Sequence, residues 1–151
     1  MAQVRFEVHH DFSAPARAVW DELVDWERHG EWIPATRMDV PPGGATEPGQ
    51  EFTAYTGLGP LALKDHMRVV RCDWDDSTSS GDCEVEKLGP VLRGSAGFTV
   101  SPTPGGSSIV WIEDVTVPYT PQFAAPIVAK LGALGFRIGM GKLDALVSAS
   151  D

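Results

Sequence analysis

The acidic residue Glu113 stands among apolar neighbours in the segment 107–117. Alternate side chains of an extended strand point to the same side, so Glu113 shares a face with Ile109 and Trp111. This face is the more apolar of the two and is expected to point inward, where an unpaired carboxylate is costly. We therefore expect Glu113 either to pair with an arginine or to contact a ligand and act as a general acid or base.

Asp65 is a second candidate of the same kind. It alternates with Leu63 and Met67 in the segment 62–72, which places its carboxylate on an apolar face. In this register Asp65 joins Glu113 as a candidate catalytic acid or base.

The register of that strand has an alternative, which depends on the two cysteines. If Cys72 lies opposite Cys83 across the intervening turn, Asp65 moves to the other face. His66 and Arg68 then point inward instead. The sequence leaves both registers open, and in either one an ionisable side chain enters the interior.

Other motifs that resemble catalytic or binding sites lack the required spacing. The segment 135–142 looks like a phosphate-binding loop, but five residues rather than four separate Gly135 from Gly141, and Leu143 replaces the required Ser or Thr. The segment 93–97 lacks the first glycine of a nucleophile elbow. The four histidines form neither an HExxH motif nor an i, i+4 pair, so we expect no metal site, and no cofactor is required.

Charge and composition restrict the partners and the compartment. The 151-residue chain has a formal charge of −9, and its 12 basic residues form no stripe, which disfavours nucleic acid and anionic membrane surfaces. No run of about 18 apolar residues is present, so we expect no stable membrane insertion. The start of the chain lacks a signal peptide and two cysteines fit a reducing compartment, which predicts a cytoplasmic protein. The oligomeric state is left open.

The spacing of apolar residues along the chain indicates which strands and helices position these residues. Residues 4–12 alternate as a strand, and a helical stripe follows at Ala16, Val19, Trp20, Leu23 and Val24. A second short helix over 26–32 is ended by Pro34. Turn-rich clusters then separate six expected strands at 36–40, 50–57, 62–72, 83–88, 91–100 and 107–117.

A long helix is predicted over residues 121–149. One face carries Ile127, Leu131, Leu134 and Ile138, and the apolar residues Leu143, Leu146 and Val147 follow beyond them. Four glycines interrupt the pattern at 132, 135, 139 and 141, each unfavourable in a helix by about 1 kcal/mol relative to alanine. Two explanations stay open, namely close packing of the helix on the sheet and room for a ligand beside it.

Together these elements predict one α+β domain over residues 1–151. Short connections make neighbouring strands antiparallel, and a seven-stranded sheet with one apolar face needs a cover. The last helix is the long amphipathic element that can supply it, so we expect the sheet to curl around this helix.

The order of elements and the segment DFSAPARAVWDELVDWERHGEWIP at 11–34 resemble the START-like helix-grip superfamily. The segments at 65–74, 91–100 and 109–118 look like the sheet of its polyketide cyclase and dehydrase branch. The resemblance implies an interior cavity between the sheet and the last helix that binds apolar ligands. It does not imply a reaction, because this superfamily holds enzymes and carriers.

We expect eleven side chains to line this cavity, most of them large and apolar or aromatic. They are His10, Trp32, Phe52, His66, Met67, Arg68, Phe98, Trp111, Phe123, Phe136 and Met140.

Our leading hypothesis is a binder of a small hydrophobic or aromatic molecule, such as a polyketide, lipid, isoprenoid or quinone-like compound. The alternative is a polyketide cyclase, aromatase or dehydratase that uses a cavity carboxylate as acid or base, because a shaped dry site needs no complete catalytic triad. A third hypothesis is a stress or regulatory module that acts through a partner protein. It predicts an exposed apolar patch and a closed interior, whereas both ligand hypotheses predict an open pocket.

Overall fold

The computed structural model describes residues 1–43 and 46–149. It contains seven strands, three α-helices and three short 3₁₀ segments. In chain order these are β1 (Ala2–Phe12), α1 (Ala16–Leu23), η1 (Trp26–Arg28), α2 (His29–Trp32), β2 (Thr36–Asp39), β3 (Glu51–Thr56), η2 (Gly59–Leu61), β4 (Leu63–Asp75), β5 (Ser80–Leu88), β6 (Arg93–Thr103), β7 (Gly106–Val117), η3 (Gln122–Ala124) and α3 (Ala125–Ala149).

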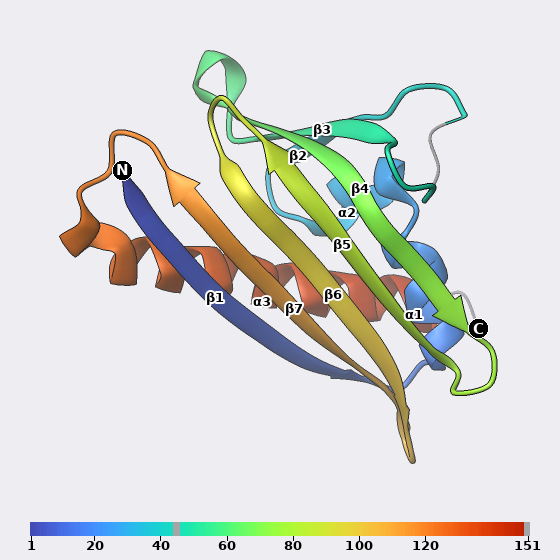
Figure 1. Ribbon diagram of the computed structural model, residues 1–151. Helices are drawn as coiled ribbons and strands as arrows, with labels where there is room; N and C mark the ends of the chain where they lie inside the picture. Colours follow the sequence, from blue (N-terminus) through green and yellow to red (C-terminus); the bar gives the residue numbers. More distant parts are fainter. Residues whose placement is uncertain (44–45, 150–151) are drawn as a thin grey trace.

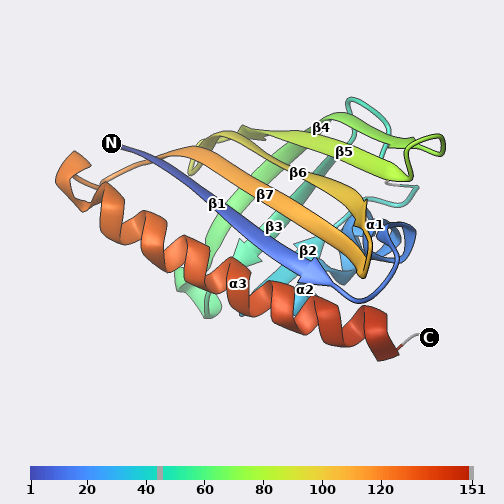
Figure 2. The ribbon, with the colours of Figure 1, turned by 90° about the horizontal axis from the view of Figure 1, so that it is seen from below.

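All seven strands form one antiparallel sheet in the order β1-β7-β6-β5-β4-β3-β2. The sheet curls over α3, which runs along its concave side, and α1 and α2 lie at one end (Figures 1 and 2). Strand pairing, layer order and the position of the last helix confirm the predicted helix-grip fold.

The hairpin that joins β4 and β5 is tighter than expected. The polar cluster at 73–82 was predicted as a turn, but Trp74 pairs with Gly81 and Asp75 with Ser80, so both strands continue into it. Packing explains the difference, because the ring of Trp74 lies 5.8 Å from that of Trp20. Gly81 has no side chain and so leaves room for Trp20 above the strand.

A bulge in β4 decides the face of Asp65. Cys72 pairs with Cys83, as one of the two predicted registers required, but the pairing shifts between Val69 and Arg71. The extra residue restores the inward direction of the earlier part of the strand. Asp65 therefore faces inward together with Cys72, and the expectation that this cysteine pair turns Asp65 outward is wrong.

The helix α3 packs on the sheet with a different face from the one expected. Ile127, Leu131, Leu134 and Ile138 are 49–64% exposed. The face toward the sheet carries Ala133, Gly139, Met140, Leu143 and Val147. Small residues allow a close approach, since a methyl group on Gly132 would meet the ring of Phe6 and one on Gly139 would meet Trp32. Packing thus accounts for two of the four glycines.

Candidate functional site

A cavity of about 380 Å³ lies between the inner face of the sheet and α3. This volume falls within the range of about 300–1,000 Å³ that small-molecule sites occupy. Its wall is mostly apolar, and six aromatic side chains contribute to it, namely Phe6, Trp26, Phe52, Phe98, Trp111 and Phe136. The site is therefore suited to a molecule that is largely apolar.

The aromatic rings support one another across several strands. Trp26 and Phe52 are stacked with their centroids 4.5 Å apart, and Phe98 and Trp111 are stacked at 5.3 Å. Phe136 from α3 lies 4.8 Å from Trp111 and so links the helix to the sheet. Such contacts hold the rings in fixed positions, which favours a cavity that is formed before a ligand binds.

The cavity opens beside the N-terminal half of α3. Leu63 at the start of β4 and Leu131 on α3 both line the cavity, and they are 40% and 64% exposed. Gly135 also lines it, and a methyl group added there would meet no atom within 4 Å. Of the two explanations for the helix glycines, room for a ligand therefore fits Gly135.

Five of the eleven expected cavity residues are in the wall: Phe52, Met67, Phe98, Trp111 and Phe136. Both candidate acid–base residues, Asp65 and Glu113, also line it. They come from β4 and β7, which are separated in the sheet by β5 and β6. The curvature of the sheet brings the two carboxylates to one cation, as described below.

The expectation that His66 and Arg68 line the cavity is wrong. Both lie on the outer face of β4, where His66 is 2.8 Å from the carboxylate of Glu51. Arg68 extends toward Glu51 and Glu86 on the same outer face. The inward direction of Asp65, restored by the bulge, requires its neighbours in the strand to face outward.

Four further expected wall residues lie elsewhere. His10 contacts Asp144 of α3 at 3.0 Å, and neither residue lines the cavity. Trp32 and Met140 are fully buried in the core, and Trp32 packs edge-on against Trp111 from behind the wall. Phe123 in η3 is 85% exposed, because the chain there precedes the part of α3 that covers the sheet.

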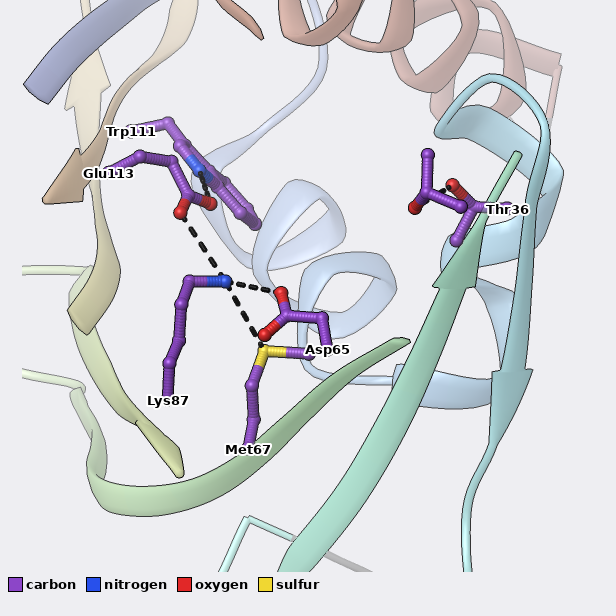
Figure 3. A network of polar contacts seen from close by, with 7 residues as sticks. Thr36, Asp65, Met67, Lys87, Trp111 and Glu113 are labelled. Atoms are coloured by element: carbon purple, nitrogen blue, oxygen red, sulfur yellow. Dashed lines mark hydrogen bonds and ion pairs between the residues drawn. The ribbon is translucent and has the colours of Figure 1, made fainter. Parts of the chain in front are cut away.

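Lys87 is the charged residue that the sequence analysis did not identify. Its ammonium group donates a hydrogen bond to Asp65 Oδ2 and lies 3.4 Å from Glu113 Oε2 (Figure 3). A third contact joins Nζ to the sulfur of Met67 at 3.8 Å. The side chain of Lys87 is 4% exposed, so this cation is fully enclosed between two carboxylates.

The alternation of side chains along β5 indicates that Lys87 is buried. Lys87 alternates with Cys83 and Val85 along β5, and all three are buried on the inner face. A lysine in such a pattern indicates a buried cation, which requires buried carboxylates nearby. Asp65 and Glu113 supply them, in place of the arginine that was expected to pair with Glu113.

The environment of these groups changes their protonation. Burial raises the pKa of Glu113, and Asp65 raises it further, while Lys87 and the Trp111 indole N–H, which donates to Oε1 at 3.1 Å, oppose the change. Burial by itself lowers the pKa of Lys87, but the two carboxylates outweigh it, so the pKa of Lys87 is raised. Lys87 therefore remains an ammonium group and does not act as an amine nucleophile.

One polar atom of the cluster has no partner. Oδ1 of Asp65 is buried and accepts no hydrogen bond from the described residues. Across the cavity, the hydroxyl groups of Thr36 and Thr56 lie 3.0 Å apart, and Thr36 is seen opposite the charged cluster in Figure 3. The apolar cavity thus has polar groups on two sides.

His29 is a further wall residue that the sequence analysis missed. Its Nε2 lies 2.6 Å from the carbonyl oxygen of Leu23. Burial lowers the pKa of His29 to about 4, so the neutral ring donates this hydrogen bond. His29 fixes the end of α1 relative to α2 and presents an uncharged ring to the cavity.

Within residues 1–43 and 46–149, no group of three or more His, Cys, Asp or Glu side chains is arranged to hold a metal ion. The polar chemistry of the described site is therefore that of Lys87, its two carboxylates and the threonine hydroxyls.

The fold and the cavity define a helix-grip protein with an apolar site between the sheet and its last helix. The chain belongs to the family described as polyketide cyclase / dehydrase and lipid transport, whose sequence model matches residues 3–148. The superfamily resemblance drawn from the sequence is thereby confirmed. No curated protein matches the chain.

Solved structures show the same fold at low sequence identity. Protein NE0264 from Nitrosomonas europaea is 15% identical, with a TM-score of 0.69 over 97% of this chain and 96% of that chain. Protein CV1439 from Chromobacterium violaceum is 16% identical, with a TM-score of 0.66 over 95% and 96%. Ara h 8.0201 is 16% identical, with a TM-score of 0.63 over 98% and 99%.

Proposed function

We propose that the protein binds a small, largely apolar molecule in the cavity, with one neutral polar group placed at the charged cluster. The observation that carries this proposal is an apolar cavity of about 380 Å³ whose wall contains an enclosed cation with two carboxylates. Membership of a family of polyketide cyclases, dehydrases and lipid-transport proteins supports a hydrophobic ligand.

The contacts of Lys87 restrict the polar group of the ligand. The ammonium group has three hydrogens, and its contacts with Asp65, Glu113 and Met67 use all three. No donor of Lys87 is left for an anionic ligand, and a carboxylate there would meet two others. A hydroxyl, phenol or carbonyl group avoids this repulsion, because Glu113 can accept a hydrogen bond when ionised and donate one when protonated.

These contacts favour some of the candidate ligands over others. A polyketide phenol, an isoprenoid alcohol or a quinone-like compound carries a neutral oxygen at one end, whereas a fatty acid carries an anion. The proposed ligand is therefore of the first kind.

The proposal is tested by binding of a neutral apolar dye, N-phenyl-1-naphthylamine, followed by displacement at neutral pH. We expect 2-naphthol to displace the dye at least about tenfold more effectively than 2-naphthoate, because burying an unpaired charge is costly. Native mass spectrometry of freshly purified protein provides a second measurement, in which a copurified neutral molecule is expected. Failure of the dye to bind, or equal displacement by the anion, contradicts the proposal.

An enzyme of the cyclase or dehydratase type is a second candidate. Glu113 favours it, because burial raises the pKa of this carboxyl group and its side chain lines the cavity. A carboxyl group with a raised pKa can protonate or deprotonate a bound polyketide near neutral pH. Lys87 then donates a hydrogen bond to the second carboxyl group, Asp65. A regulatory module with a closed interior is not supported, since the cavity is open beside Leu131.

A further inference from the structure

The outer face of α3 carries an exposed aliphatic stripe. Ile127, Leu131, Leu134 and Ile138 are 63%, 64%, 51% and 49% exposed. At 100° per residue they fall within an arc of about 60°, and they extend over about 17 Å of the helix. Met140 and Leu143, which are fully buried, lie on the opposite side of the helix, so the stripe faces away from the sheet.

Positive charges flank the stripe on both sides. By the same rotation, Lys130 and Arg137 follow one edge of the arc and Lys142 lies at the other. All three are exposed, and none forms an ion pair with the side chains that the structure describes. Their charges are therefore available to a partner.

The charge of this helix is opposite to that of the remainder of the protein. The helix α3 contains three cations and one carboxylate, Asp144, so its formal charge is +2. The whole chain carries −9, so the remainder carries −11. The net negative charge of the whole chain disfavours binding to an anionic surface. The positive charges of α3, however, lie beside the exposed aliphatic residues, where they can attract an anionic surface.

We propose that the outer face of α3 docks on an anionic lipid surface, with the aliphatic stripe in the interfacial region and the cations at the headgroups. An apolar stripe between basic residues is the pattern of helices that lie in a membrane interface. The segment Gln122–Ala149 is long and apolar enough to cross a bilayer. Its inner face covers the sheet, however, so we propose that the helix lies on the membrane surface and does not cross the bilayer.

Two observations favour lipid over other occupants. A second copy of the chain placed stripe to stripe brings the same cations together, which is repulsive. The stripe also reaches the opening of the cavity, because Leu131 belongs to both. An apolar ligand therefore passes between lipid and cavity without exposure to bulk water, a consequence that rests on the proposed function.

Cosedimentation with vesicles tests the docking proposal. We use phosphatidylcholine vesicles with and without about one third phosphatidylglycerol, in about 0.1 M salt. The wild-type protein is expected to sediment with the anionic vesicles and to do so much less with phosphatidylcholine alone. Substitution of the three cations, K130Q/R137Q/K142Q, is expected to weaken binding to anionic vesicles about a hundredfold.

A second variant separates the apolar contribution. L134S/I138S is expected to weaken binding about tenfold, because these two side chains no longer enter the interfacial region. The matched control R5Q/R17Q/K64Q removes the same charge from other surfaces and is expected to sediment with the anionic vesicles at least as well as the wild type. None of these residues lines the cavity, so dye binding in the absence of vesicles should stay at the wild-type level and shows that each variant is folded.

Three results overturn the docking proposal. They are a wild-type protein that does not sediment with anionic vesicles, an L134S/I138S variant that binds like the wild type, and a wild-type dimer that this variant dissociates in light scattering. The last result assigns the stripe to self-association. Loss of dye binding with intact vesicle binding would contradict the cavity proposal alone, so the two failures are distinguishable.

Discussion

Replacing Lys87 with methionine keeps the length of the side chain and removes the cation between two buried carboxylates. Lys87 is 4% exposed, and the side chains of Asp65 and Glu113 are 14% and 8% exposed. Solvent therefore screens these charges little. Removal of one partner from a buried ionic cluster leaves uncompensated charge and lowers the free energy of unfolding by about 3–5 kcal/mol.

This loss is a large part of the about 5–15 kcal/mol that stabilises a typical domain. For a chain of this length, the thermal midpoint is expected to fall by about 6–20 °C. Urea denaturation at neutral pH measures the loss directly as a lower midpoint with little change in slope.

Two controls identify the carboxylates as the cause. Adding D65N and E113Q to K87M removes both charges and is expected to recover most of the lost stability. Acid should act in the same direction, because protonation of the two carboxyl groups removes the charge that K87M leaves uncompensated. The stability that their protonated forms provide is present at low pH and lost as pH rises, so K87M approaches the wild type as pH falls. A loss below about 1 kcal/mol in K87M, or a triple variant no more stable than K87M, would refute the cluster as described.

Three further predictions concern other parts of the site. The pKa of His29 falls from 6.5 to about 4 in the folded protein, so the stability of the wild type should decrease by about 3 kcal/mol as pH falls from about 6.5 to 4. H29Q should lose this dependence in urea denaturation at both ends of that range. The raised pKa of Glu113 contributes stability that is present at low pH and lost as pH rises, so E113Q should gain stability relative to the wild type as pH rises above the ordinary pKa of a glutamate, 4.5. If the protein is an enzyme, the same variant loses turnover in a substrate assay while ligand affinity changes only modestly. G132A places a methyl group 2.6 Å from the ring of Phe6 and should lower the unfolding free energy by about 1–3 kcal/mol, whereas G141A should raise it by about 0.5–1 kcal/mol. Equal effects of the two alanine substitutions would show that Gly132 does not pack as described.

The sequence predicted the parts of the site that depend on a regular period. Alternation along β7 placed Glu113 inside, and the same rule, applied to β5, identifies Lys87. Asp65 was ambiguous because one bulge residue, Val70, reverses every side chain on one side of it, and no local pattern marks the bulge.

The helix α3 shows a different limit of sequence reasoning. Its largest aliphatic residues, such as Ile127 and Leu134, indicated the buried face, yet they are exposed. The face with glycine and alanine packs on the sheet, because Phe6 and Trp32 lie where larger side chains at Gly132 and Gly139 would clash. This choice depends on partners that are distant in the sequence, as does the packing of Trp32 behind Trp111.

The measurement that tests ligand binding in the cavity most directly compares two leucine substitutions in α3. A Cβ atom added at Gly135 or at Gly141 has no neighbour within 4 Å, but Gly135 lines the cavity and Gly141 does not. Both variants gain about 0.8 kcal/mol of helix propensity, so stability is matched. Fluorescence titration with N-phenyl-1-naphthylamine should show affinity at least about tenfold weaker for G135L, whose leucine occupies the cavity mouth, and unchanged for G141L. Equal affinities for the two variants would contradict binding in this cavity.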